Sequence, residues 1–223
     1  MPKIKFSLLS IIGGLTLLSS SAYAGVDAEV SYILNTLLFL IGGFLVMWMA
    51  AGFAMLESGL VTSKSVATIA AKNIGLYSIA GLMFWLVGYN LAYGIPEGGF
   101  IGSFLPWSDA SAVDTGYSDG SDWFFQMVFC ATTCSIVSGT LAERIKIWPF
   151  FLFCAILAGI IYPIEMGWQW GGGHLAAAGF SDFAGSTLVH SAGAAAALAG
   201  AILLGPRLGR FTDSGEAAPM APF

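Results

Sequence analysis

Charged residues divide this chain into long uncharged segments. Beyond the N-terminal region, five segments of 18 to 27 residues contain no lysine, arginine, aspartate or glutamate. In chain order they are 30–56, 73–96, 123–142, 147–164 and 183–206. About 20 apolar residues in a helix cross the hydrocarbon core of a bilayer. The pattern therefore predicts five transmembrane helices and an all-α integral membrane protein.

The first 24 residues have the pattern of a secretory signal peptide. Lys3 and Lys5 form a short basic region, an apolar stretch follows at 6–18, and an A-x-A cleavage pattern lies at 22–24. We therefore interpret 1–24 as a signal peptide that is removed from the mature chain. The alternative is an uncleaved first helix, because the segment beyond Lys5 is also uncharged.

The basic residues predict the orientation. With the N-terminus outside, six cations that follow spans one, three and five all face the cytoplasm, as the positive-inside rule requires. These cations are Lys64, Lys72, Arg144, Lys146, Arg207 and Arg210. The loop between spans two and three is acidic and contains Glu97, Asp109, Asp114, Asp119 and Asp122. We predict a multi-pass protein of the cell inner (plasma) membrane, with its N-terminus outside and 207–223 in the cytoplasm.

The composition agrees with a membrane protein. Hydrophobic residues make up 57% of the chain, charged residues make up 9%, and the mean hydropathy is +0.82. Soluble domains, in contrast, contain about 25% charged residues. The net charge of −5 comes mainly from the acidic outer loop, so no nucleic-acid partner is expected.

Two ionisable residues mark the fifth segment. Asp182 precedes it, where a carboxylate can cap the exposed backbone N–H groups of a helix N-terminus. His190 follows eight residues later, which places it about 12 Å deeper on a continuous helix. An ionisable side chain inside a membrane is costly, and this favours a permeation or relay role for His190. The alternative is a neutral histidine that is hydrogen-bonded within the helix bundle.

Aromatic residues form a candidate outer cation site. Phe125 and Phe129 are four residues apart and therefore share one face of a helix. A pair at this spacing is usually a packing contact, and Trp170 alone would be an interface anchor. Phenylalanine and tryptophan rings around a small cation also provide cation–π stabilisation without a fixed countercharge. Under this reading, the field of a buried Asp182 would further favour an incoming cation.

The segment from Asp182 to Gly205 resembles the signature of the ammonium transporter (Amt/Mep/Rh) family. The resemblance is strongest in Asp182-Phe183-Ala184-Gly185-Ser186 with His190. Further matching motifs follow the same order along nearly the whole mature chain. They are Glu57-Ser58-Gly59-Leu60, Leu141-Ala142-Glu143-Arg144, Trp170-Gly171-Gly172-Gly173 and Gly205-Pro206-Arg207. An ordered set of motifs is far more specific than any single one.

The resemblance implies a role for each candidate residue. Phe129 would belong to an external phenylalanine gate, with Phe125 beside it. Trp170 would help to form an outer site that recruits ammonium, and Asp182 would support that site structurally and electrostatically. His190 would be the first histidine of a pair in the pore.

The resemblance also implies a larger architecture. Family members have about eleven spans, built as two inverted five-helix repeats with the pore at their interface. Residues 25–206 would be the first repeat, and 207–223 would be a truncated cytoplasmic segment. A second pore histidine, a second gate phenylalanine and a recruitment-site serine would lie in the other half. We therefore expect an N-terminal portion of a transporter, with a dimerising half-transporter as the alternative.

The implied function is transport of ammonium or ammonia through a narrow hydrophobic pore in the lipid bilayer. The resemblance implies a homotrimer when full length, a cytoplasmic regulatory protein as a partner, and neither enzymatic activity nor a cofactor. An ammonium sensor of transporter-like architecture and an inactive fragment are the competing interpretations. A metalloenzyme is disfavoured because His174 and His190 lie in different segments without a paired-ligand motif.

Overall fold

The computed structural model describes residues 26–218, so the predicted signal peptide lies outside the described residues. The α-helices are α2 (Ala28–Gly59), α3 (Val66–Met83), α4 (Tyr89–Tyr93), α5 (Asp119–Leu141), α6 (Ile147–Ile156), α7 (Tyr162–Gly167), α8 (His174–Ala177) and α9 (Leu188–Leu204). Short 3₁₀ turns are η1 (Ser63–Ser65) and η3 (Val113–Thr115), and π-helical turns are η2 (Phe84–Gly88) and η4 (Leu157–Ile161). In this part of the chain, β-type pairing is limited to an isolated bridge between Phe211 and Ala217.

Four helices of the described region are long and apolar enough to cross a membrane. They are Ala28–Gly59, Ser63–Tyr93, Asp119–Leu141 and Ile147–Gly167. The second and the fourth continue through the π-helical turns η2 and η4, which contact each other. Each of the four overlaps most of one of the first four uncharged segments, so the sequence pattern located these spans correctly.

The fifth predicted span differs from the prediction. Its helix, α9, covers only the 17 residues Leu188–Leu204. The expectation that the helix begins at residue 183 is wrong, because 183–187 form bends and turns. The uncharged segment therefore consists of a non-helical entry followed by a shorter apolar helix.

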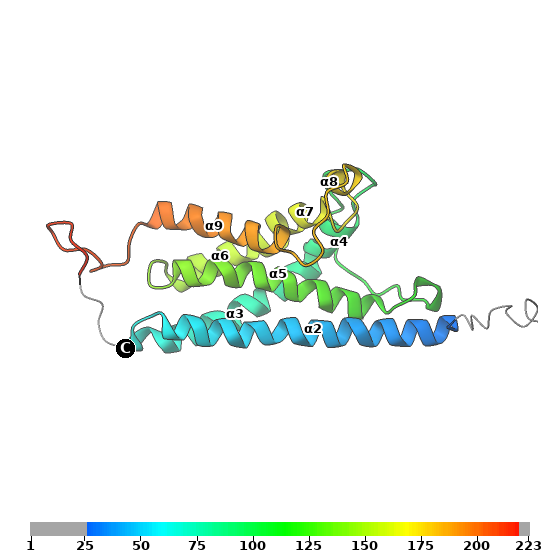
Figure 1. The fold of residues 1–223 in the computed structure, drawn as a ribbon, viewed down its shortest axis with the longest axis horizontal. Helices are drawn as coiled ribbons and strands as arrows, with labels where there is room; N and C mark the ends of the chain where they lie inside the picture. Colours follow the sequence, from blue (N-terminus) through cyan, green and yellow to red (C-terminus); the bar gives the residue numbers. More distant parts are fainter. Residues whose placement is uncertain (1–25, 219–223) are drawn as a thin grey trace, which may run out of the picture.

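Helix α5 is the centre of the bundle. It lies between α2 and α9 in Figure 1, and it contacts both of them as well as α3. Val128, Cys134 and Val137 on α5 have no exposed surface. Close approach to α2 depends on glycine, because a Cβ at Gly43 would lie 2.6 Å from the Phe124 ring. The helix that carries Phe125 and Phe129 is thus fixed by packing on several sides.

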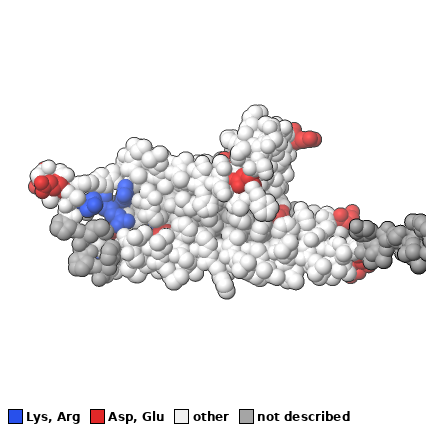
Figure 2. Space-filling view, viewed as in Figure 1, with Lys and Arg blue, Asp and Glu red and all other residues white. Residues whose placement is uncertain are grey.

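The bundle has two chemically different ends. We call one the arginine end, because Arg144, Arg207 and Arg210 lie there beyond α5 and α9. The opposite end, here called the aromatic end, holds α4, α8 and the loop that contains Trp170 (Figure 1). Figure 2 shows the visible lysine and arginine atoms gathered at the arginine end, while most visible acidic side chains lie toward the other end.

One cation that the sequence assigns to the cytoplasmic surface is buried instead. Lys72 lies within α3, and its Nζ is 3.0 Å from Oε2 of Glu57 on α2. The two side chains are 5% and 1% exposed. Lys72 therefore does not contribute to the exposed charge of the arginine end, because a carboxylate inside the bundle neutralises it.

Candidate functional site

A turn around the Asp182 carboxylate leads into α9. Oδ1 of Asp182 accepts hydrogen bonds from the backbone N–H groups of Gly185 at 2.8 Å and Ser186 at 3.1 Å. Oδ2 accepts from those of Thr187 at 2.7 Å and Leu188 at 2.8 Å. The side chain thus satisfies N–H groups that the start of a helix leaves without partners. The sequence predicts Asp182 as the cap of a helix that begins at residue 183. In the structure Thr187 is the N-cap of α9, and Asp182 instead holds the preceding turn, with only its Leu188 partner inside the helix.

The Asp182 carboxylate is buried, with 7% of the residue exposed. Burial alone would raise its pKa, but the four backbone hydrogen bonds hold the pKa below the ordinary value of 3.8. Asp182 is therefore an anion at neutral pH. Each of its oxygens already accepts two backbone hydrogen bonds, so a nearby cation would meet the field of Asp182 and not a free acceptor.

Trp170 is attached to the same turn. Its Nε1–H donates a hydrogen bond to the backbone carbonyl of Asp182 at 2.6 Å. Gly185 has φ of 83°, and a Cβ at this position would lie 3.1 Å from Cη2 of Trp170. Glycine therefore serves both the turn and the close approach of the indole. Since the indole N–H is already bonded, Trp170 offers its π surface to any further partner.

The candidate aromatic residues form one continuous series. The ring centroids of Phe129 and Trp170 are 5.6 Å apart with an interplanar angle of 68°. Those of Phe125 and Phe129 are 5.2 Å apart at 83°. Both are edge-to-face contacts, the arrangement that aromatic quadrupoles favour. The predicted common face of Phe125 and Phe129 is confirmed, and α5 brings it against Trp170.

His190 lies in the first turn of α9. Its Nδ1 is 3.2 Å from the carbonyl oxygen of Gly185. A carbonyl can only accept, so this contact assigns the proton of the neutral ring to Nδ1 and leaves Nε2 as an acceptor. The residue is exposed within the described part of the chain. His190 therefore keeps one ring nitrogen for another partner.

The structure changes the predicted relation between Asp182 and His190. The expected depth of about 12 Å assumed a continuous helix, and this assumption is wrong because α9 begins only at Leu188. Gly185 connects the two residues instead: its N–H donates to Asp182 and its carbonyl contacts His190. The sequence analysis assigned no role to Gly185, although its place in the Asp182–Ser186 motif was the available signal.

The site combines three chemical properties. A buried anion lies beneath the turn, aromatic rings stand beside it, and a histidine provides a hydrogen-bond acceptor. These groups suit a small cation that can donate hydrogen bonds. Between residues 26 and 218, no group of three or more His, Cys, Asp or Glu side chains is arranged to hold a metal ion.

The helices and this site define a multi-pass membrane protein. The model of the Ammonium Transporter Family matches residues 37–222, which is most of the sequence. The chain belongs to this family.

Curated relatives agree with this assignment. The chain is 42% identical over 189 residues to a putative ammonium transporter of Synechocystis, covering 82% of this chain and 42% of the relative. It is 41% identical over 192 residues to the ammonium transporter Amt2 of Archaeoglobus fulgidus, covering 79% of this chain and 40% of that protein. The chain thus spans less than half the length of these relatives.

Solved structures share the fold. A protein described as a sensor Amt protein superposes with a TM-score of 0.75 at 34% sequence identity, covering 82% of this chain and 47% of that one. Mep2 of Candida albicans superposes with a TM-score of 0.70 at 25% identity, covering 82% of this chain and 42% of Mep2. The described helices therefore match about half of each larger structure.

Proposed function

We propose that this chain forms part of a path for ammonium or ammonia across a membrane. The observation that carries the proposal is the contact of Phe129 with Trp170 beside the Asp182 turn. In this proposal, the rings of Trp170 and Phe129 hold an incoming ammonium ion by cation–π attraction. The field of Asp182 favours its arrival, and Phe125 and Phe129 form a gate below it.

In the proposed path, the substrate meets His190 after it passes the gate. Its Nε2 accepts a hydrogen bond from the substrate while Nδ1 remains bonded to Gly185. Ammonium that enters a narrow apolar pore loses its water, so such a hydrogen bond offsets part of the lost hydration. A sodium or potassium ion that has lost its water has no hydrogen to donate to this nitrogen. Selectivity therefore depends on hydrogen bonding as well as on pore width.

The proposed path is completed by sequence that lies outside this chain. Residues 25–206 act as the first of two inverted repeats, with α9 as the fifth span and the pore between the repeats. A second histidine, a second gate phenylalanine and a serine come from the other repeat. The assembled transporter is a homotrimer in the inner membrane, and a cytoplasmic regulatory protein is its partner. The support is the family membership together with the share of each relative that this chain covers.

The proposed orientation places the aromatic end outside and the arginine end in the cytoplasm. It rests on the gathering of lysine and arginine side chains at one end (Figure 2), which the positive-inside rule favours for the cytoplasm. Ala112→Cys and Lys64→Cys place thiols at exposed positions at opposite ends, and the native cysteines are buried. A membrane-impermeant thiol reagent applied from outside should label the first variant only. Labelling of the second alone would reverse the orientation.

Flux measurements test the proposed transport. Vesicles containing the longest reading frame that includes this chain should take up methylammonium, and excess ammonium, but not excess potassium, should suppress that uptake. The chain of 223 residues should show no uptake above that of empty vesicles, because one repeat cannot close the pore. Saturable uptake by this chain alone would establish the dimerising half-transporter. Equal suppression by potassium and ammonium in the longer protein would contradict ammonium selectivity.

An ammonium sensor is the second candidate function. Its specific support is the structural similarity to the protein described as a sensor Amt protein. In a sensor, ammonium would bind at the site of Trp170 and Phe129 without net flux. Ammonium that quenches Trp170 fluorescence in the longer protein, together with flux no greater than that of empty vesicles, would favour the sensor over the transporter.

A further inference from the structure

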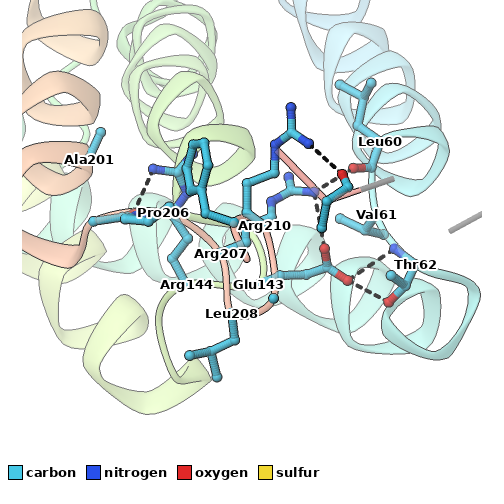
Figure 3. A pocket seen from close by; sticks show the side chains of 14 residues that line it. Leu60, Val61, Thr62, Glu143, Arg144, Ala201, Pro206, Arg207, Leu208 and Arg210 are labelled. Carbon is cyan, nitrogen blue, oxygen red and sulfur yellow. Dashed lines mark hydrogen bonds and ion pairs between the residues drawn. The ribbon is translucent and has the colours of Figure 1, made fainter. Parts of the chain in front are cut away.

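Three of the motifs that the ammonium path does not use meet at the arginine end. They are the end of Glu57–Leu60, the Glu143-Arg144 pair, and Gly205-Pro206-Arg207. Residues of all three line one pocket of about 740 Å³. Figure 3 shows Leu60, Glu143 and Arg207 entering it from three separate segments of the chain. Its volume is within the range of small-molecule sites, roughly 300–1,000 Å³.

The pocket has an excess of positive charge. Arg144, Arg207 and Arg210 line it, and Glu143 is the acidic side chain in the described lining. Oε2 of Glu143 accepts a hydrogen bond from Nη1 of Arg207 at 3.0 Å. Oε1 accepts one from the Thr62 backbone N–H at 3.0 Å and another from the Thr62 hydroxyl. Glu143 therefore neutralises one arginine and leaves two.

The remaining arginines retain unused donors. Arg144 donates from Nη1 to the carbonyl of Gly205 at 3.0 Å, while its buried Nε has no hydrogen-bond partner among the described residues. Arg210 donates from Nη1 to the carbonyl of Ala218 at 3.0 Å. A guanidinium has five N–H donors, so each side chain can bind a further acceptor. The Nε of Arg144 is enclosed by protein, so an acceptor in the pocket would meet the remaining Nη donors of the two side chains.

The backbone of the pocket is strained at Glu143. Glu143 has φ of 60°, a left-handed conformation that is strained for a residue with a side chain. The conformation directs its carboxylate to Thr62 and Arg207. Strain of this kind persists where surrounding contacts enforce it, and it clusters at functional sites.

We propose that this pocket binds a phosphate group. Several arginine forks match the geometry of phosphate oxygens, and two positive charges match the charge of phosphate. The pocket lies at the end of the apolar helices, where the headgroups of anionic lipids gather. The phosphate therefore belongs either to a lipid headgroup or to free phosphate in the cytoplasm. The site is separate from Trp170 and His190, so it does not depend on the proposed ammonium path.

Binding by the 223-residue chain tests the proposal. The variants are Arg144→Gln and Arg210→Gln, with Lys146→Gln as the control, because Lys146 is exposed at the same end outside the pocket. One arm titrates inorganic phosphate against chloride in detergent. The other compares nanodiscs of phosphatidylcholine with nanodiscs that also contain phosphatidylglycerol. The readout is the rise in unfolding temperature, after the unfolding temperature without ligand has established that each variant is folded.

We expect wild type and Lys146→Gln to be stabilised equally. Each arginine variant should require about tenfold more ligand, the effect of one lost charge-assisted hydrogen bond. Stabilisation by inorganic phosphate identifies free phosphate as the ligand, and stabilisation confined to phosphatidylglycerol identifies a lipid headgroup. The proposal would be overturned if neither arm raised the unfolding temperature of wild type. It would also be overturned if Lys146→Gln needed as much additional ligand as the arginine variants. Among the described residues the Arg210 side chain makes one hydrogen bond, to the Ala218 carbonyl, so its variant remains informative if Arg144→Gln does not fold.

Discussion

The ammonium group of Lys72 lies 3.0 Å from the carboxylate of Glu57, inside the helix bundle. Lys72 also donates to the Ser138 carbonyl at 2.8 Å, and the Ser138 hydroxyl donates to Glu57 at 3.0 Å. The ring of Phe150 is 5.1 Å from Lys72 Nζ. The pair thus joins α2, α3, α5 and α6. Its position fixes α5, the helix that carries Phe125 and Phe129.

Breaking this pair should be costly, and removing both charges should be much less so. Lys72→Met leaves a buried carboxylate without a countercharge, so we expect a loss of about 3–5 kcal/mol in the free energy of unfolding. Glu57→Gln should cost a similar amount. The double variant should lose less than the sum, because neither charge remains unpaired. Denaturant titration in detergent measures this, with the exposed Lys64→Met as control. Additive losses would show that the two charges act independently.

Replacing Asp182 by asparagine should lower the free energy of unfolding, and replacing it by alanine should lower it further. Asparagine retains one acceptor oxygen and leaves two of the four backbone N–H groups without a partner, whereas alanine removes all four bonds. We expect a loss of about 1–3 kcal/mol for Asp182→Asn and a larger one for Asp182→Ala. Unfolding of each variant measures the loss, with the exposed Asp114→Asn as control. Wild-type stability in Asp182→Ala would refute the cap.

The stabilisation that Glu143 provides through its contacts with Thr62 and Arg207 should weaken in acid. Partial burial raises the pKa of Glu143, but hydrogen bonds from Thr62 and Ser65 and the charge of Arg207 outweigh it and lower the pKa below 4.5. A depressed pKa stabilises the folded state above the unfolded pKa, and this stabilisation is lost as pH falls through the folded value. Wild type should therefore be more stable than Glu143→Gln at neutral pH, and the difference should disappear well below pH 4.5. A difference that persists in acid would contradict the role of the charge.

The sequence could predict the spans and several contacts of the site. Uncharged segments located four helices, because hydropathy averaged over a helix length depends little on tertiary detail. Spacing placed Phe125 and Phe129 on one face, and the position of Asp182 before an apolar segment predicted that it bonds backbone N–H groups there, although not the turn that separates it from α9. These predictions succeeded because each depends on neighbours within a few residues along the chain.

Other features depend on contacts that local pattern does not contain. Glu57 and Lys72 border uncharged segments, so the pattern treats them as span ends, while their pairing arises when α2 and α3 fold together. The late start of α9 depends on Asp182 reaching backbone groups as far as Leu188 across the Gly185 turn. The arginine pocket likewise requires three segments that are far apart in the sequence.

The most direct test of the account is methylammonium flux through the longest reading frame that contains this chain, with His190 replaced by alanine. Ser191→Ala is the matched control, because Ser191 is the exposed neighbour on the same helix. In His190→Ala protein of normal oligomeric state, flux per folded molecule or selectivity against potassium should fall about fivefold or more. This corresponds to one lost substrate hydrogen bond of about 1 kcal/mol. Flux and selectivity equal to those of wild type would make His190 a packing residue and contradict the proposed path.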